Sequence, residues 1–406
     1  TPGAGSIGDY FGIPVNGVSV THSALWYRAY NLIWNEWFRD QNLQDSVAVN
    51  TDDGPDAAGP YGLLRRGKRH DYFTSCLPFA QKGDAVLLPL GSTAPVVPIA
   101  GLPIQFTDPA TQTALNTANA ATGLGNTINM GQVPEANWPG GQIAFSNPQL
   151  QADLSTATAA TINDLRQAFQ IQKLLERDAR GGTRYIEIIK AHFGVTSPDA
   201  RLQRPEYLGG GSTPVMISPI AQTSESGTTA QGTLAAIGTA SLHGHGFVKS
   251  FTEHMTLIGL VCVRADLSYQ QGLERQWSRT TRFDFYWPAL SHIGEQAVLN
   301  KEIQLGHASG DDAVFGYQER YAEYRYKPSL ITGLFRSSHP QTLDAWHLSQ
   351  NLSNPALNAT FIQENPPVDR VIAVDTEPHF LFDSIFDLKC ARPMPVYGVP
   401  GLIDHF

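Results

Sequence analysis

Four basic side chains lie within five positions, where Arg65, Arg66, Lys68 and Arg69 surround Gly67. Guanidinium and ammonium groups bind phosphates and carboxylates. Because the whole chain has a formal net charge of −9, this local concentration suggests contact with a nucleic acid or with carboxylates of a neighbouring chain. The alternative is a solvated loop with a few surface ion pairs, which would contribute little.

Two histidines offer the most plausible metal ligands in the sequence. His243 and His245 lie two positions apart, a spacing at which two imidazoles can share a metal ion. However, Gly244 and Gly246 make the segment mobile, and no Asp or Glu lies close in sequence to complete the three or four ligands that a site needs. We therefore expect no metal site there.

The remaining polar clusters do not match known catalytic patterns. Asp52, Asp53 and Asp56 lie in a turn-rich acidic loop but lack the spacing of an EF-hand. His70 and Asp71 are adjacent, and successive side chains of a strand point to opposite faces. The sequence contains no GxSxG, HExxH, GxGxxG or P-loop motif in the required context. It therefore predicts no catalytic residue, no metal and no cofactor, and hence no enzyme.

The basic run opens a segment of changing character. Asp71–Leu77 has the aromatic and β-branched content of a strand, which Pro78 would end. Residues 79–84 read as a turn, since Gly83 accepts a positive φ. The apolar residues 85–88 follow.

An aromatic helix is predicted upstream of the basic run. Trp26, Tyr30, Ile33 and Trp37 recur at intervals of four, three and four, the spacing of one helical face. Aromatic stripes of this kind usually pack inward, so we favour a core helix over an exposed binding helix.

Two consecutive helices are predicted between residues 161 and 193. The first begins at Thr161 and ends at Gly181-Gly182, and the second begins at Thr183 and ends at Gly194. We expect the pair to lie on a β core and to bridge subunits. The predicted apolar faces comprise Ile162, Leu165, Ala168, Phe169, Ile171 and Leu175 in the first helix, and Tyr185, Ile186, Ile189 and Phe193 in the second.

The last third of the chain has the strongest strand patterns. Leu257–Val263 is a short continuous apolar run, and Tyr317–Tyr326 mixes tyrosines with charged residues. Near the end, Phe380, Phe382, Phe386 and Leu388 lie on one side of an alternating pattern, typical of a half-buried antiparallel strand. The sequence thus predicts a mainly β fold, a jelly-roll β-sandwich with long loop insertions and a few helices.

The composition is compatible with extensive subunit contacts. Only 16% of residues are charged, while Gly (37) and Pro (27) are plentiful, so much of the surface carries amides and hydroxyls. Such groups cost less to bury than charges, although a secreted β protein can have a similar composition.

The three cysteines, Cys76, Cys262 and Cys390, indicate small buried side chains made in a reducing cytoplasm, without a disulfide framework or zinc site. We expect no membrane insertion, because no apolar run reaches about 20 residues, and we expect no charged-then-apolar leader at Thr1.

The segment RRGKRHDYFTSCLPFAQKG resembles the signature of the major capsid proteins of gokushoviruses, a branch of the Microviridae. YRAYNLIWNEWFRDQNLQDSV and DDGPD precede it, as they do in that family, and the likeness extends over nearly the whole chain. It is weakest between Gly91 and Leu150. The signature positions are Asp71, Tyr72, Phe73, Leu77, Pro78, Gln81, Lys82 and Gly83.

The resemblance implies a viral jelly roll that self-assembles into a T=1 icosahedral shell around a circular single-stranded DNA phage genome. It also implies a virion component that assembles in the bacterial cytoplasm with an internal scaffolding protein and a DNA pilot protein. An insertion would form threefold protrusions that meet a host surface receptor. From their concentration in an acidic chain, and not from the resemblance, we expect the four basic residues to face the interior or a subunit junction, where they would meet packaged DNA or a neighbour's acidic loop. The family also has a further N-terminal portion, so we expect some early strands of the sandwich to be absent from this sequence.

The sequence divides into four expected parts. Residues 1–90 would hold an N-terminal arm, the aromatic helix and a jelly-roll strand, and residues 91–150 the surface insertion. Residues 151–250 would hold the helical pair with connecting loops, and residues 251–406 the C-terminal jelly-roll strands and loops. A carbohydrate-binding β-sandwich without enzymatic activity remains an alternative, but it would not require the insertion or the polar, weakly charged surface.

Overall fold

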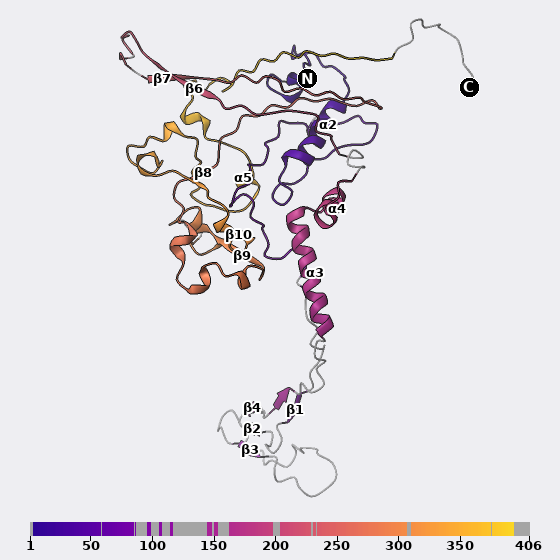
Figure 1. The fold of residues 1–406 in the computed structure, drawn as a ribbon, viewed down its shortest axis with the longest axis vertical. Coiled ribbons are helices and arrows are strands. Elements are labelled where there is room, and N and C mark those ends of the chain that lie inside the picture. Colours follow the sequence, from indigo (N-terminus) through magenta and orange to yellow (C-terminus); the bar gives the residue numbers. More distant parts are fainter. Residues whose placement is uncertain are drawn as a thin grey trace, which may run out of the picture. The chain divides into compact units, whose positions relative to one another are not determined.

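The structure is a computed structural model. It describes residues 3–57, 59–84, 86, 96–98, 105–107, 114–116, 144–147, 150–152, 162–197, 204–228, 230–232, 234–306, 310–374 and 376–393. It divides into two compact units (Figure 1). Unit 1 comprises Thr1–Ala80 and Arg201–Phe406, and unit 2 comprises Gln81–Ala200. The fourfold division expected from the sequence stays a prediction. The expected insertion, residues 91–150, falls almost wholly outside the described residues.

Unit 1 contains short helices and small sheets. Its α-helices are α1 (Ile7–Tyr10), α2 (Leu25–Ile33) and α5 (Ala359–Ile362), and a π-helix, η1 (Trp34–Phe38), continues α2. Its strands are β6 (Met216–Ala221), β7 (Leu234–Thr239), β8 (Ser268–Tyr269), β9 (Glu295–Leu299), β10 (Val314–Glu319) and β11 (Ser329–Leu330). Short 3₁₀ turns include η6 (Arg275–Ser278), η7 (Arg282–Asp284), η9 (Asn300–Glu302) and η10 (Ala322–Tyr324).

The sheets of unit 1 are pairs of strands. β6 pairs with β7 and β9 with β10, both antiparallel, while β8 and β11 are parallel. Most of the described unit is irregular chain between these pairs. The described strands do not by themselves make up a jelly roll, so that part of the expected fold stays a proposal.

The core of unit 1 is mainly aromatic. Phe73 packs edge-on against Tyr269 with ring centroids 4.7 Å apart, and Phe315 packs against Phe361 at 5.0 Å. Burying such rings contributes about 2 to 3 kcal/mol each. The other buried members of this cluster are Tyr72, Cys76, Val298, Ile303 and Ala322.

The strand expected at Asp71–Leu77 is wrong. Residues 72–75 form a turn, and only Leu77 makes a β-bridge, with Tyr317. The cause is the Asp71 carboxylate, whose Oδ1 accepts hydrogen bonds from the amides of Phe73 and Thr74 at 2.9 and 2.8 Å. A short carboxylate that captures the following amides favours a turn over an extended chain. The turn expected at residues 79–84 is consistent with Gly83, whose φ is 77°.

The aromatic helix forms, but its buried face is shifted from the expected one. Trp26 and Trp37 are each 47% exposed, whereas Tyr27, Tyr30 and Trp34 are buried. Tyr27 packs against Phe11 and Tyr61. The π-helix carries Trp37 away from the core, where its indole Nε1 donates to Pro205 O at 2.9 Å.

Unit 2 contains the predicted helix pair. α3 (Ile162–Gly181) and α4 (Tyr185–Phe193) end at the expected glycines, and Gly194 has the left-handed φ of 71°. Thr161, the expected cap, lies outside the described residues. The expected inner faces are not buried within the single chain: neither helix has a buried residue, and Phe169, Tyr185 and Phe193 are exposed.

The described strands of unit 2 form two small antiparallel sheets. In one sheet, β1 (Val96–Pro98) pairs with β5 (Leu150–Ala152). In the other, β2 (Gln105–Thr107) pairs with both β3 (Ala114–Asn116) and β4 (Ala144–Asn147).

The late strand predictions differ from the structure. Residues 257–263 and 380–388 show no ladder pairing, and the latter run as a long ribbon without an arrow (Figure 1). The segment 317–326 is half right, since β10 ends at Glu319 and η10 follows. Phe382 and Phe386, expected on a half-buried face, are exposed.

None of the three cysteines, all of which are described, forms a disulfide. Cys76 is buried, whereas Cys262 and Cys390 are exposed, against expectation. Within the described part of the chain, no helix combines the length and the apolar character needed to cross a lipid bilayer.

Candidate functional site

The basic segment is held between two other parts of unit 1. The amide of Gly67 donates to Phe38 O at 2.7 Å, and the amide of Lys68 donates to Ile362 O at 2.7 Å. Gly67 also forms an antiparallel bridge with Gln363. In an extended chain, alternate side chains point to opposite sides. Accordingly, Lys68 is buried, whereas Arg65 and Arg69 are exposed.

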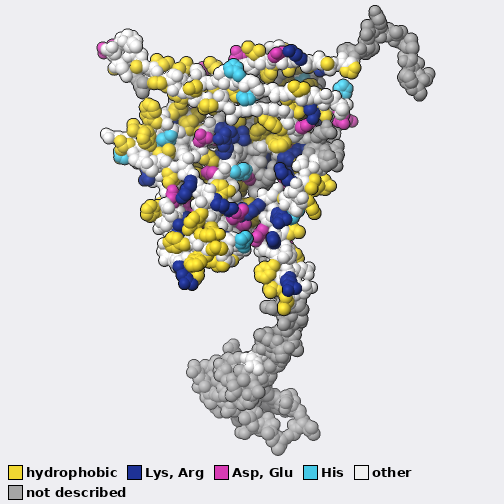
Figure 2. Space-filling view, viewed as in Figure 1, with side chains coloured by type: hydrophobic (Ala, Val, Ile, Leu, Met, Phe, Trp, Pro, Cys, Tyr) yellow, Lys and Arg dark blue, Asp and Glu magenta, His cyan; other side chains and the backbone are white. Residues whose placement is uncertain are grey.

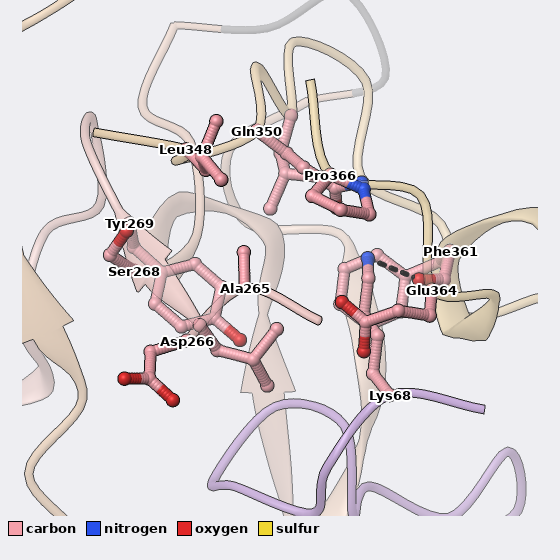
Figure 3. Close-up of a pocket in the computed structure, with 12 residues that line it drawn as sticks. Lys68, Ala265, Asp266, Ser268, Tyr269, Leu348, Gln350, Phe361, Glu364 and Pro366 are labelled. Carbon is pink, nitrogen blue, oxygen red and sulfur yellow. Dashed lines mark hydrogen bonds between the residues drawn. The ribbon is translucent and has the colours of Figure 1, made fainter. Parts of the chain in front are cut away.

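Lys68 points into the unit, toward α5 and the chain beyond it (Figure 3). Its side chain is 7% exposed, and Nζ donates to Phe361 O at 2.5 Å and lies 4.7 Å from the centre of the Phe361 ring. Burial lowers the pKa of Lys68 to about 8, although Glu364 and Asp71 oppose this shift. Lys68 therefore acts as an internal cation of this unit.

The three arginines stay near the surface and have acidic or polar neighbours. Arg65 donates to Asn365 Oδ1, and Arg69 Nη1 lies 3.3 Å from Asp266 Oδ1. Arg66 stacks over Phe38, with its Cζ 5.1 Å from the ring centre, and donates to Cys262 Sγ at 3.2 Å. These contacts leave the guanidinium charges only partly neutralised.

A further arginine joins this basic patch. Burial, followed by the positive charges of Arg66 and Arg69, lowers the pKa of Arg264. Because these positive charges repel one another, an anion that binds beside them would lower the electrostatic energy. Burial likewise raises the pKa of the neighbouring Glu364 carboxyl. We call Arg65, Arg66, Arg69 and Arg264 the arginine patch.

The acidic loop serves a structural purpose. Arg28 Nε donates to Asp56 Oδ2 at 2.7 Å, and Tyr61 Oη donates to the same oxygen at 2.5 Å. These hydrogen bonds hold the pKa of Asp56 well below its usual range. Arg28 also contacts Asp52. The loop thus anchors α2 through an arginine.

The histidine pair is exposed, and His243 Nε2 lies 2.6 Å from Ser241 Oγ. Among the residues that the structure describes, no three or more His, Cys, Asp or Glu side chains come together as metal ligands would.

The signature positions divide between the two units. In unit 1, Tyr72 and Phe73 lie in the core and Leu77 exchanges backbone hydrogen bonds with Tyr317. In unit 2, Lys82 Nζ lies 3.5 Å from Asp178 O of α3, and Gln81 donates to Asp84 O. The signature, which also includes Asp71, Pro78 and Gly83, therefore specifies packing and turns in the described structure.

Sequence reasoning missed the acidic and basic partners of the patch. Arg264, Asp266 and Glu364 lie about 200 to 300 positions from the basic run, so nothing local in the sequence indicates their proximity. The spacing of charged residues gave no signal for them.

Comparisons with known proteins agree with one another. A family model described as "Capsid protein (F protein)" matches residues 2–402. Capsid protein VP1 of Bdellovibrio phage phiMH2K is 49% identical over 420 residues, covering 99% of this chain and 77% of the relative. Capsid protein VP1 of Chlamydia phage 1 is 43% identical over 460 residues, covering 98% and 77%. Capsid protein VP1 of Spiroplasma virus 4 is 40% identical over 428 residues, covering 98% and 76%.

Proposed function

The chain belongs to the capsid protein (F protein) family of phages, and from that premise we propose that it forms a T=1 icosahedral shell around a circular single-stranded DNA genome. Its role as a major capsid protein of the virion follows from near-full-length similarity to the VP1 proteins. Self-assembly is part of that role. The proposal concerns the lattice, the genome and the surfaces that build the particle.

The observation that best supports assembly is the apolar surface of the single chain. Leu381 and Ile385 are 101% and 96% exposed, and every residue of β6 is exposed. Hydrophobic side chains spread widely over the visible face (Figure 2). Monomeric proteins seldom leave such large apolar areas in water, so the exposed segments are suited to cover by other copies.

We assign the long ribbons of unit 1 to the jelly roll of the assembled shell. Residues 380–388 have the alternating pattern expected of a strand, and β6 and β7 already form an antiparallel pair. Unpaired strand edges gain hydrogen bonds and lose exposed apolar area when another strand is added. Each contact between two copies can be weak, because in a closed shell every copy is held by several such contacts at once.

The remaining partners rest on family membership. We propose an internal scaffolding protein and a DNA pilot protein, and a host receptor contacted by residues 91–150. The exposed helix pair α3 and α4 is suited to bridging subunits. A structural role without bond-making chemistry fits this family, so we propose no enzymatic activity.

Negative-stain electron microscopy of the expressed chain, together with the N-terminal extension of its relatives, tests the main proposal. We expect uniform hollow icosahedral particles, because the exposed apolar segments then become buried. A monodisperse monomer that binds sugars on a glycan array would contradict the proposal and favour the carbohydrate-binding alternative.

The basic segment gives a second prediction. We propose that Arg65, Arg66 and Arg69 contact packaged DNA or a neighbour's acidic loop, while Lys68 supports them from inside. Replacing the three arginines with glutamine should lower the fraction of DNA-filled particles several-fold, because each lost phosphate contact weakens binding and reduces its salt dependence. Particle DNA content is measured by the ratio of absorbance at 260 and 280 nm.

The matched control removes the same charge elsewhere. Arg282, Arg325 and Arg336 are exposed, and their replacement by glutamine should leave genome content unchanged. Equal DNA content in the two triple variants would count against the assignment of DNA contact to the basic segment. If particle yield fell while the DNA content per particle stayed normal, the basic segment would instead lie at a subunit junction.

A further inference from the structure

Unit 1 contains a pocket with a basic lining, and none of its lining residues belongs to the arginine patch. It is formed by η6, β9, η9 and the turn from β10 into η10. Four cations line it: Arg275, Arg279, Lys301 and Arg320. These four cations come from three stretches of the chain that lie about 20 to 45 positions apart. They are close together only in the folded chain. Arg279 is also held by aromatic rings, with its Cζ 4.4 Å from the centre of Tyr324.

The acidic side chains of the pocket already have donors within the protein. Glu302, Asp284 and Glu323 line the pocket beside the cations. The oxygens of these three carboxylates already accept hydrogen bonds from groups of the protein. The donors are Arg275 Nη1, Tyr72 Oη and the amide of Leu299 for Glu302, the amides of Thr280 and Thr281 for Asp284, and Gln296 Nε2 for Glu323.

Three polar atoms on the basic side of the pocket have no acceptor in the described part of the chain, although two of the cations form ion pairs through other atoms. Arg279 Nη2 lies 3.6 Å from Glu323 Oε1, and Lys301 Nζ lies 2.6 Å from Asp312 Oδ1. Ser278 Oγ, Arg279 Nε and Arg320 Nε are buried, line this pocket and have no hydrogen-bond partner among the described residues. Buried polar groups in native proteins are almost always paired, and leaving a donor unpaired is costly. Two guanidinium N–H groups and a hydroxyl around one pocket call for a ligand that offers several acceptor oxygens.

We propose that this pocket binds a phosphate group. Phosphate oxygens would accept hydrogen bonds from Arg279 Nε, Arg320 Nε and Ser278 Oγ. The four cations of the lining outnumber its three carboxylates, Asp284, Glu302 and Glu323, so an anion is favoured there. Arginine pairs well with phosphate, since its planar donors match the oxygens. Inorganic phosphate and the backbone of a single-stranded nucleic acid share this chemistry.

Calorimetric titration of the purified chain with inorganic phosphate at constant ionic strength tests the site. We expect saturable binding, and at least tenfold weaker binding in Ser278→Ala and in Arg320→Lys, because each loses a hydrogen bond to a charged ligand. Without phosphate, Ser278→Ala should unfold at the same temperature as the wild type, since its hydroxyl has no protein partner. Arg282→Gln, on η7 but outside the pocket lining, should bind like the wild type.

Competition identifies the source of the phosphate. If an oligothymidylate displaces inorganic phosphate in the wild type but not in Arg320→Lys, the site takes a nucleic-acid phosphate. If it does not compete, the site takes the free ion. Absence of saturable binding, or equal affinity in Ser278→Ala, Arg320→Lys and the wild type, would overturn the proposal. Particle formation is measured separately, so its failure is distinguishable from failure of this site.

Discussion

Replacing Glu302 with alanine is expected to lower the free energy of unfolding by about 3 to 5 kcal/mol, the usual cost of breaking a buried ion pair from one side. The side chain of Glu302 is 3% exposed, and Oε1 lies 3.1 Å from Arg275 Nη1. Its other oxygen accepts from Tyr72 Oη at 3.2 Å. Removing the carboxylate takes one acceptor from the half-buried Arg275 guanidinium, which also donates to Ala297 O, and leaves the buried Tyr72 phenol without its acceptor. Thermal or denaturant unfolding of the purified chain measures the change.

Two further variants identify the cause. Glu302→Gln keeps the shape and should cost less than Glu302→Ala, since one carbonyl oxygen still accepts. Glu319→Ala removes an exposed carboxylate that pairs with Arg325, and should change stability by at most about 1 kcal/mol. If Glu302→Ala and Glu319→Ala were equally stable, the buried network would not stabilise the fold as described.

The stability of the chain is also expected to rise with pH between about 8 and 10.5 because of Lys68. In the folded chain, burial lowers the pKa of Lys68 from 10.5 to about 8. Between these values the unfolded chain binds more protons than the folded chain, so the free energy of unfolding increases with pH. At about 1.4 kcal/mol per pKa unit, the increase is roughly 3 kcal/mol.

The measurement is the pH dependence of unfolding in the wild type and in Lys68→Met. Other groups titrate in the same range, but they are common to both proteins and cancel in the difference. The wild type should gain roughly 3 kcal/mol over Lys68→Met between pH 8 and 10.5. Phe361→Leu disturbs the packing around Lys68 but keeps its ammonium, so it should lower stability and retain the rise. Parallel curves for the wild type and Lys68→Met would contradict the burial of a charged Lys68.

Local signals in the sequence predicted some features well. Gly182 and Gly194 directly follow α3 and α4 with φ values of 90° and 71°, because glycine permits the left-handed backbone that terminates a helix. The signature segment also indicated the capsid family, which the comparisons confirm. Both inferences rest on short stretches of contiguous sequence.

Features set by distant partners were not predictable. The sequence places Lys68 with three arginines, but its burial depends on Phe361 and Ile362, almost 300 residues later. Asp71 was expected in a strand, yet its carboxylate holds the next turn and accepts from Tyr269 Oη at 2.6 Å. The pocket lined by Arg275, Arg279, Lys301 and Arg320 was not predicted, because its cations come from three separate stretches of the chain.

The bridge between Gly67 and Gln363 also sets the timing of folding during synthesis. Ribosomes add about 5 to 20 residues per second, so roughly 15 to 60 s separate the synthesis of these two residues. Until then the amides of Gly67 and Lys68 cannot both find their partners, and the aromatic core lacks Phe361. A nascent chain therefore completes this core only when translation is nearly finished, which delays the moment at which one copy can dock onto another.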